Sequence, residues 1–335
     1  MSANLYDLFT SRLPADTEKT FLETEDGATL AYGDIEAAAG RMTRLLSDLG
    51  VSPGDRVAVQ VDKSPQAVLL YLACLKAGAV YLPLNTAYTA DEIGYFLADA
   101  EPRVLVCRPG DGEALSAVKE AAGVEHMASL GADGSGTLIG QSAALQPTAG
   151  AVERNGDDLA AILYTSGTTG RSKGAMITHH NLASNALALH RIWGWRDGDV
   201  LLHALPIFHV HGLFVALHCA LLNASKVLFM SGFDADAVIE RLPRSTVMMG
   251  VPTFYSRLAG HPRMTPKLCA NMRLFISGSA PLLAETFQAF EERSQHRILE
   301  RYGMTEAGMI TSNPLDGERL AGTVGFPLPQ VRVRL

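Results

Sequence analysis

The residues best suited to chemistry lie in one short stretch, from Tyr164 to Gly174. Its sequence, Tyr-Thr-Ser-Gly-Thr-Thr-Gly-Arg-Ser-Lys-Gly, combines hydroxyl side chains, glycines and the mobile positive charge of Lys173. Glycine lets backbone N–H groups turn towards a ligand, and hydroxyls add short donors. Such donors bind an anion, and a polyphosphate suits them best. The Walker A spacing Gly-x-x-x-x-Gly-Lys-[Ser/Thr] does not fit, so the stretch predicts a different kind of phosphate loop.

The alternative for this stretch is a flexible linker of Gly, Thr and Ser. We disfavour it because the flanking residues 159–164 and 175–178 are predicted to form buried strands. Those strands would hold the two ends of the loop in place.

Two further motifs lie downstream. Ser277-Gly-Ser-Ala-Pro281 follows a strand that we expect over residues 273–277. Open α/β sheets bind ligands at such turns, where a strand ends. The second motif is Arg301-Tyr-Gly-Met-Thr-Glu-Ala-Gly308. There the aromatic face of Tyr302 suits a purine, and the carboxylate of Glu306 suits a magnesium ion bound to phosphate oxygens.

A pair of histidines, His209 and His211, is spaced as two metal ligands could be. No cysteine or carboxylate accompanies them in the local sequence, so we disfavour a metal site there. A purely structural role for this pair stays open.

Together the three motifs resemble the signatures of the ANL superfamily of adenylating enzymes, which contains acyl-CoA synthetases, peptide-synthetase adenylation domains and firefly luciferase. The resemblance implies that ATP, Mg²⁺ and CoA take part, and that a carboxylate attacks the α-phosphorus while pyrophosphate leaves. It also implies catalytic roles for Lys173, Thr305 and Glu306, and a metal site at Glu306 and Thr169. The ATP contacts that it implies are Thr165, Ser166, Gly167, Thr168, Thr169, Gly170, Ser172, Lys173, Ser277, Gly278, Ser279, Ala280, Pro281, Arg301, Tyr302, Gly303, Met304 and Thr305.

Within this superfamily the chain most closely resembles the malonyl-CoA synthetase branch, mainly through two arginines, Arg257 and Arg301. Malonate keeps a second carboxylate that does not react, and burying that charge without a partner is costly. Arginine is always charged and can hold a carboxylate with two hydrogen bonds. For Arg257 a surface position, and for Arg301 an ordinary ion pair, are the alternatives. The resemblance implies an acyl pocket of His209, Arg257, Arg301, Ser277 and Met304.

Two other functions stay open at this point. One is a CoA ligase for another short-chain or methyl-substituted (di)carboxylic acid. The other is a non-catalytic nucleotide-binding module. Intact Lys173, Thr305 and Glu306 favour the enzymes over the module.

Helices and strands alternate along the chain, which predicts an α/β fold with mainly parallel sheets covered by helices on both faces. The resemblance implies the large N-terminal domain of an ANL enzyme. We expect a first subdomain over residues 1–150 and a second, with the ATP and acyl sites, over residues 151–335. Residues 109–156, rich in Gly, Ala and Ser, are predicted to be a surface excursion without chemistry.

The family's enzymes continue through a ribose-binding motif and a hinge into a small lid domain with a catalytic lysine. This chain ends in Val331-Arg-Val-Arg-Leu335, which we expect to be a strand. The interpretation is an engineered or proteolytic N-terminal portion without the lid domain. Such a portion is expected to bind nucleotide but not to complete the reaction.

Composition limits the partners and the compartment. The net charge of −7 argues against nucleic-acid binding, and charged or polar residues interrupt the most apolar windows, which argues against a membrane span. The four cysteines are far apart in apolar contexts, which favours free thiols in a reducing compartment. The first residues show no signal peptide, so we expect a cytoplasmic protein with small-molecule substrates. The sequence gives no indication of the oligomeric state.

Overall fold

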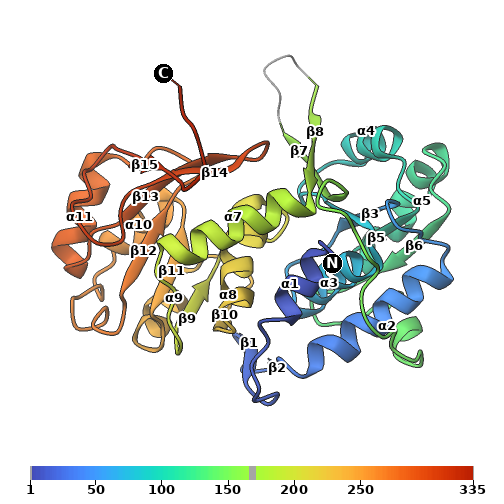
Figure 1. Cartoon of the computed structure of the whole chain (residues 1–335), viewed down its shortest axis with the longest axis horizontal. Helices are drawn as coiled ribbons and strands as arrows, with labels where there is room; N and C mark the ends of the chain where they lie inside the picture. Colours follow the sequence, from blue (N-terminus) through green and yellow to red (C-terminus); the bar gives the residue numbers. More distant parts are fainter. Residues whose placement is uncertain (1, 166–170, 335) are drawn as a thin grey trace.

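Two sheets organise the chain in this computed structural model, which describes residues 2–165 and 171–334. The first has six strands in the order β6-β5-β3-β4-β7-β8. The second has nine, in the order β15-β14-β13-β12-β11-β9-β10-β1-β2. Figure 1 shows the two sheets side by side, with α7 crossing between them.

In the six-stranded sheet, all pairs are parallel except the β7–β8 hairpin. In the nine-stranded sheet, the antiparallel pairs are β1–β2 at one end and β13–β14 and β14–β15 at the other. The bounds are β1 Thr20–Thr24, β2 Thr29–Ala31, β3 Arg56–Gln60, β4 Val80–Pro83, β5 Val104–Cys107, β6 His126–Ser129, β7 Leu159–Thr165, β8 Lys173–Thr178, β9 Val200–His203, β10 Lys226–Phe229, β11 Val247–Gly250, β12 Leu274–Ser277, β13 Leu299–Met304, β14 Gly308–Ser312 and β15 Phe326–Pro327.

Helices cover both sheets, as the alternating sequence predicts. The α-helices are α1 Leu5–Thr10, α2 Asp34–Asp48, α3 Pro65–Ala77, α4 Ala90–Ala100, α5 Gly112–Ala121, α6 Thr137–Ser142, α7 His179–Ile192, α8 His218–Leu222, α9 Ala235–Arg241, α10 Pro252–Ala259 and α11 Ala284–Ser294. Short 3₁₀ turns, η1 Pro109–Asp111 and η3 Leu242–Arg244, and a π-helical segment, η2 His211–Leu217, complete the set.

Local signals in the sequence set several helix ends. Gly78 ends α3 with φ of 69°, a left-handed conformation that glycine adopts without strain. Thr89 and Glu92, spaced as a Thr-x-x-Glu capping box requires, form that box at the start of α4. Pro252 occupies the first turn of α10, where its missing N–H has no partner to lose.

The fold class is confirmed, but several local expectations are wrong. Residues 109–156 are not a plain surface excursion, because they contain α5, β6 and α6, and β6 pairs with β5. Although aspartate is a common N-cap residue, Asp34 does not cap α2 but lies inside it, and its Oδ2 accepts a hydrogen bond from the backbone N of Ala31. In β8 only Ile177 is buried, so this strand is not the buried one that we expected. Residues 331–334 are not in a strand.

Each of the two sheets contains strands from both sides of residue 150. β1, from the start of the chain, pairs with β10 through Leu22 and Val227. β7 and β8 extend the first sheet, although they follow residue 150. The division into subdomains at that residue stays a prediction.

One continuous core connects the two sheets. The largest buried cluster includes residues from α1, α3, α7, η2 and α8. In it the hydroxyl of Tyr71, on α3, lies 2.8 Å from Nε2 of His218, on α8. All four cysteines are free and buried, as predicted. None of the helices in the described ranges is both long and apolar enough to cross a bilayer.

Candidate active site

The hairpin of β7 and β8 holds the two ends of the predicted phosphate loop. Thr165 ends β7 and is paired in register with Lys173, the exposed first residue of β8. The hydroxyl of Tyr95, on α4, donates a 2.9 Å hydrogen bond to the carbonyl of Ser172. The central loop residues lie outside the described residues, and their predicted ATP and metal contacts stay predictions: Ser166, Gly167, Thr168, Thr169 and Gly170.

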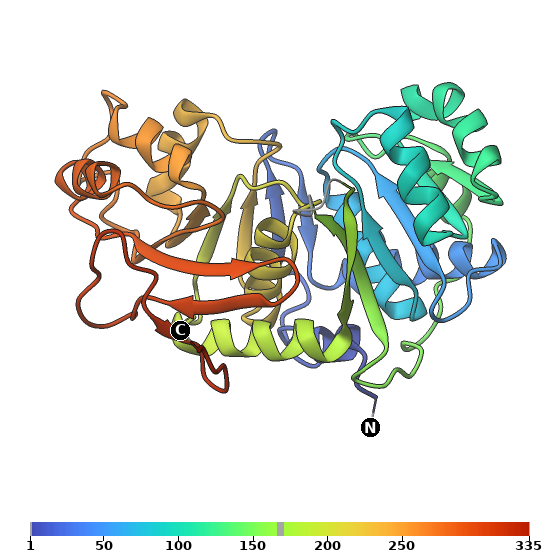
Figure 2. The same cartoon turned by 90° about the horizontal axis from the view of Figure 1, so that it is seen from above.

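The third motif lies on a second hairpin, formed by β13 and β14. Its turn carries Thr305 and Glu306, and Figure 2 shows it reaching along α7 towards β7 and β8. Thr165 Oγ1 donates a 3.0 Å hydrogen bond to Glu306 Oε1. The structure therefore joins the phosphate-loop motif and the acidic motif, which are 141 residues apart in sequence.

Magnesium, which the resemblance implies, fits the donor atoms at this junction. Glu306 is an exposed carboxylate beside a threonine hydroxyl, and magnesium in nucleotide sites is commonly held by one or two carboxylates together with phosphate oxygens. Within the described ranges, no three side chains of His, Cys, Asp or Glu converge into a metal cluster. A site here would therefore depend on oxygens of the nucleotide.

Helix α7 ties the two hairpins together. It begins directly after β8, where Thr178 and Asn181 form a capping box. Further along, Asn185 Nδ2 donates to the carbonyl of Met309 at 2.9 Å, and its Oδ1 accepts from the Met309 backbone N at 3.1 Å. The Asn185 side chain thereby bonds both backbone polar groups of Met309, as a neighbouring strand would. Met309 lies on β14, three residues after Glu306. Near the end of the helix, Trp193 Nε1 donates to Ser312 Oγ at 3.0 Å.

A groove of about 640 Å³ adjoins this junction. It is lined by Thr305 and Glu306, by residues of α7 and by residues 328–331. The motif residues thus face open space as well as each other.

Arg301, on β13, is a deeply buried cation, with only 3% of its surface exposed. Its Nε and Nη2 atoms have no hydrogen-bond partner among the described residues. Removal from water lowers the pKa of Arg301 to about 10, and Tyr255 only partly offsets this. A buried guanidinium in this state is costly unless an anion binds it.

The Ser277–Ser279 segment at the end of β12 packs directly on this arginine. A Cβ atom at Gly278 would collide with the Arg301 guanidinium, so only glycine fits there without a shift. Ser277 is fully buried, and its Oγ has no hydrogen-bond partner among the described residues. The second motif and Arg301 therefore form one polar site, whereas Ala280 and Pro281 lie just beyond it, with Ala280 exposed.

Residues along β13 alternate between the two faces of the sheet. Arg301 is buried, whereas Tyr302 and Met304 are exposed, Tyr302 by 48% of its surface. Gly303, between them, packs closely against Gly308 and Met309 of β14. An exposed tyrosine ring at this edge is available for stacking on a purine.

Arg257 does not contact Arg301 in this structure. It is exposed on α10, and its guanidinium lies 5.1 Å from the ring centre of Phe233. Phe233 in turn stacks on Phe254 at 4.0 Å. That the two arginines reach one pocket stays a prediction.

Of the two histidines, the structure points to the one that the pocket prediction left out. His209 Nδ1 accepts a 3.4 Å hydrogen bond from the backbone N of His211. His211 is buried and lies beside Ser279, with 3.2 Å between Nδ1 and Oγ. The His-x-His spacing drew attention to this residue, but only as a metal ligand. Asn185 carried no signal in the sequence.

Comparisons with known proteins identify the family and similar structures. A family model described as AMP-binding enzyme matches residues 9–335. A mitochondrial malonate–CoA ligase of Bos taurus is 34% identical over 347 residues, which cover 97% of this chain and 58% of that protein.

Two solved structures are similar over nearly the whole chain. ATP-bound MatB from Rhodopseudomonas palustris has a TM-score of 0.95 and 49% identity, covering 98% of this chain and 65% of that chain. A malonyl-CoA ligase in a product complex with methylmalonyl-CoA and AMP has a TM-score of 0.80 and 32% identity, covering 96% of this chain and 66% of that chain. The chain thus spans somewhat under two thirds of the length of these proteins.

Proposed function

The chain belongs to the AMP-binding enzyme family, and from that premise we propose that it forms the ATP and acid sites of a malonyl-CoA synthetase. The proposed enzyme activates malonate as malonyl-AMP and transfers the malonyl group to CoA. The products are malonyl-CoA, AMP and pyrophosphate. We also propose a cytoplasmic location, which suits four free, buried thiols.

The observation that carries the malonate proposal is the buried guanidinium of Arg301, whose Nε and Nη2 have no hydrogen-bond partner in residues 2–165 and 171–334. An enzyme for fatty or aromatic acids needs an apolar acyl site, and such a cation would weaken binding there. A malonate bound for activation brings its second carboxylate to the same place. That carboxylate would give Arg301 the partner that the described residues do not supply.

The adenylation step needs two groups to meet. One carboxylate oxygen of malonate attacks the α-phosphorus of ATP, and the bond from that phosphorus to the bridging oxygen of pyrophosphate breaks. We assign Lys173 to the β- and γ-phosphates, Thr305 to the α-phosphate and Tyr302 to adenine. In the second step the sulfur of CoA attacks the acyl carbon, AMP leaves with the bonding electrons, and the thiol proton passes to solvent.

Magnesium would be held by Glu306, with Thr169 as a second candidate outside the described residues. When bound, it would neutralise charge on the phosphate oxygens. The contact from Thr165 to Glu306 supports this assignment, because it places the carboxylate at the end of the phosphate loop.

Calorimetry tests the proposal on the chain as it exists. We expect binding of malonate and methylmalonate, but weak or no binding of acetate and butyrate, in the presence of a non-hydrolysable ATP analogue and Mg²⁺. Equal or tighter binding of butyrate would overturn the malonate assignment in favour of another acid. Binding of nucleotide with no effect of any acid would favour a nucleotide-binding module.

A further inference from the structure

His211 is a buried histidine, and one of its nitrogens has no partner in the part of the chain that the structure describes. Only 2% of its surface is exposed, and it is the first residue of η2. Nδ1 lies 3.2 Å from Ser279 Oγ, whereas Nε2 has no hydrogen-bond partner among the described residues. An unpaired polar atom at such depth needs an explanation.

Arg301 and His211 adjoin the same short segment. Gly278 packs against the Arg301 guanidinium, and the next residue, Ser279, contacts His211. Ser279 has φ of 71°, a backbone conformation that residues other than glycine rarely adopt. Between Ser277 and Pro281, only Ser279, which contacts the histidine, has a positive φ.

The imidazole of His211 is neutral near pH 7. Burial, followed by the charge of Arg301, holds the pKa of His211 well below its usual range. A neutral imidazole carries one N–H. When the Ser279 hydroxyl donates to Nδ1, that hydrogen is on Nε2, which is then a donor without an acceptor.

Contacts of the next residue, Gly212, hold the backbone beside His211 in place. His203 Nε2 donates a 2.9 Å hydrogen bond to the carbonyl of Gly212, and Lys63 Nζ lies 2.8 Å from Nδ1 of the same imidazole. A Cβ at Gly212 would collide with the carbonyl of Pro206. π-Helical turns such as η2 occur frequently at functional sites.

We propose that His211 is a specificity-determining residue whose Nε2–H donates to the second carboxylate of the acid that Arg301 holds. This rests on the proposed function and adds a residue to it. A carboxylate accepts several hydrogen bonds, so both groups can bind it together. A neutral donor does so without placing a second positive charge beside Arg301. An apolar acyl end would leave both groups unpaired, which is how a polar site rejects a close analogue.

The test compares H211L with H211Q, because the Gln amide can place a donor where Nε2 lies. Calorimetry with a non-hydrolysable ATP analogue and Mg²⁺ gives the affinity of the chain for malonate and for butyrate. We expect H211L to reduce the preference for malonate by about tenfold to a hundredfold. H211Q should restore at least half of the lost preference on a logarithmic scale.

H218Q is the matched control. His218 is also buried, has one bonded and one unpartnered nitrogen among the described residues, and packs against Phe9 and Tyr71. It should leave the preference unchanged. If H211L does not fold, as judged by circular dichroism, S279A replaces it. That variant removes the hydroxyl that fixes the tautomer, and we expect a severalfold loss of preference.

The outcomes separate this inference from the proposed function. If the unaltered chain prefers malonate and H211L keeps that preference, the role of His211 is wrong and the function stands. Equal losses in H211L and H211Q would also overturn a donor role. If the unaltered chain shows no preference for malonate, the proposed function fails, and the inference fails with it.

Discussion

Two arginines at neighbouring strands of the nine-stranded sheet differ in whether they have an ion-pair partner among the described residues. Arg273 directly precedes β12, at the amino end of the parallel strands, and it pairs with Asp199 through two hydrogen bonds. Arg301 lies one residue beyond the last pair of β12 with β13, at the carboxyl end, and two of its nitrogens have no partner among the described residues. Ligands bind at the carboxyl ends of such strands.

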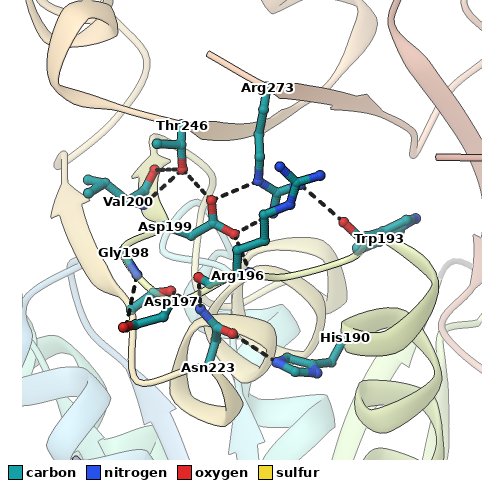
Figure 3. Close-up of polar contacts among 11 residues, drawn as sticks. His190, Trp193, Arg196, Asp197, Gly198, Asp199, Val200, Asn223, Thr246 and Arg273 are labelled. Atoms are coloured by element: carbon teal, nitrogen blue, oxygen red, sulfur yellow. Dashed lines mark hydrogen bonds and ion pairs between the residues drawn. The ribbon is translucent and has the colours of Figure 1, made fainter. Parts of the chain in front are cut away.

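The Asp199 site is a closed network, as Figure 3 shows. Its carboxylate also accepts from Thr246 Oγ1 at 2.8 Å and from the backbone N of Arg196 at 2.7 Å, while Arg273 Nη1 donates to the Trp193 carbonyl at 3.2 Å. Burial alone would raise the pKa of Asp199, but these donors outweigh it, and the pKa is lowered. The carboxylate of Asp199 and the guanidinium of Arg273 are thus partnered within the fold, which assigns this network a structural role.

The largest effect that we predict is on this closed network. D199A leaves Arg273 partly buried without its partner and should lower the free energy of unfolding by about 3–5 kcal/mol. Urea denaturation measures it. The neighbouring D197A is the control, because Asp197 is exposed and pairs with Lys19 only at 3.6 Å. If D199A lowered the free energy of unfolding by less than about 1 kcal/mol, the Asp199–Arg273 network would not be an important source of stability.

The same network predicts a pH dependence. Because the pKa of Asp199 is lower in the folded chain, its contribution is fully present above the unfolded value of about 4 and is lost as pH falls through the folded value. Unfolding experiments below pH 4 should show the gap between D199N and the unaltered chain narrowing. A gap that stays constant would contradict this assignment.

The next effect concerns the contact between the two sheets. E306Q should remove most of the gain in ATP affinity that Mg²⁺ provides, because a neutral amide is a poor magnesium ligand. Calorimetry with Mg²⁺ and with EDTA measures the gain. Glu318, a carboxylate outside the proposed site, offers the control variant E318Q. An unchanged gain in E306Q would remove Glu306 from the magnesium site.

A smaller effect is expected at Asn185, which holds β14 with two hydrogen bonds. N185A should lower the free energy of unfolding by about 1–2 kcal/mol and should weaken MgATP binding more than ATP binding in EDTA. A larger loss of MgATP binding than of ATP binding in EDTA would show that Asn185 affects the position of Glu306 as well as stability. N181A, which removes a capping contact of the same helix, is the control for stability. Equal weakening with and without magnesium would limit Asn185 to a structural role.

The sequence predicted what depends on short spacing. The capping box at Thr89 and the glycine end of α3 are set by residues within a few positions of each other, and the structure contains both. The strand ending in Ser277 could be predicted in the same way, from an apolar run followed by a glycine turn. These features need no knowledge of the rest of the fold.

Contacts between distant segments could not be predicted in this way. The pairing of Leu22 with Val227 depends on which strand edges remain open once the sheets have formed. The contact of Asn185 with Met309 depends on where α7 lies after packing. His211 was noticed for its spacing, but its partner Ser279 is 68 residues away, and nothing in the local sequence connects them.

The most direct test of the account measures folding and binding in the same two variants, R301M and R273M. R301M removes a buried charge that has no ion-pair partner in the described part of the chain, so the free energy of unfolding should be unchanged or higher, while malonate affinity falls by about 2–4 kcal/mol. R273M should do the reverse, with lower stability and unchanged malonate affinity in the folded protein. If R301M binds malonate as tightly as the unaltered chain, Arg301 does not hold the second carboxylate and the central claim is wrong.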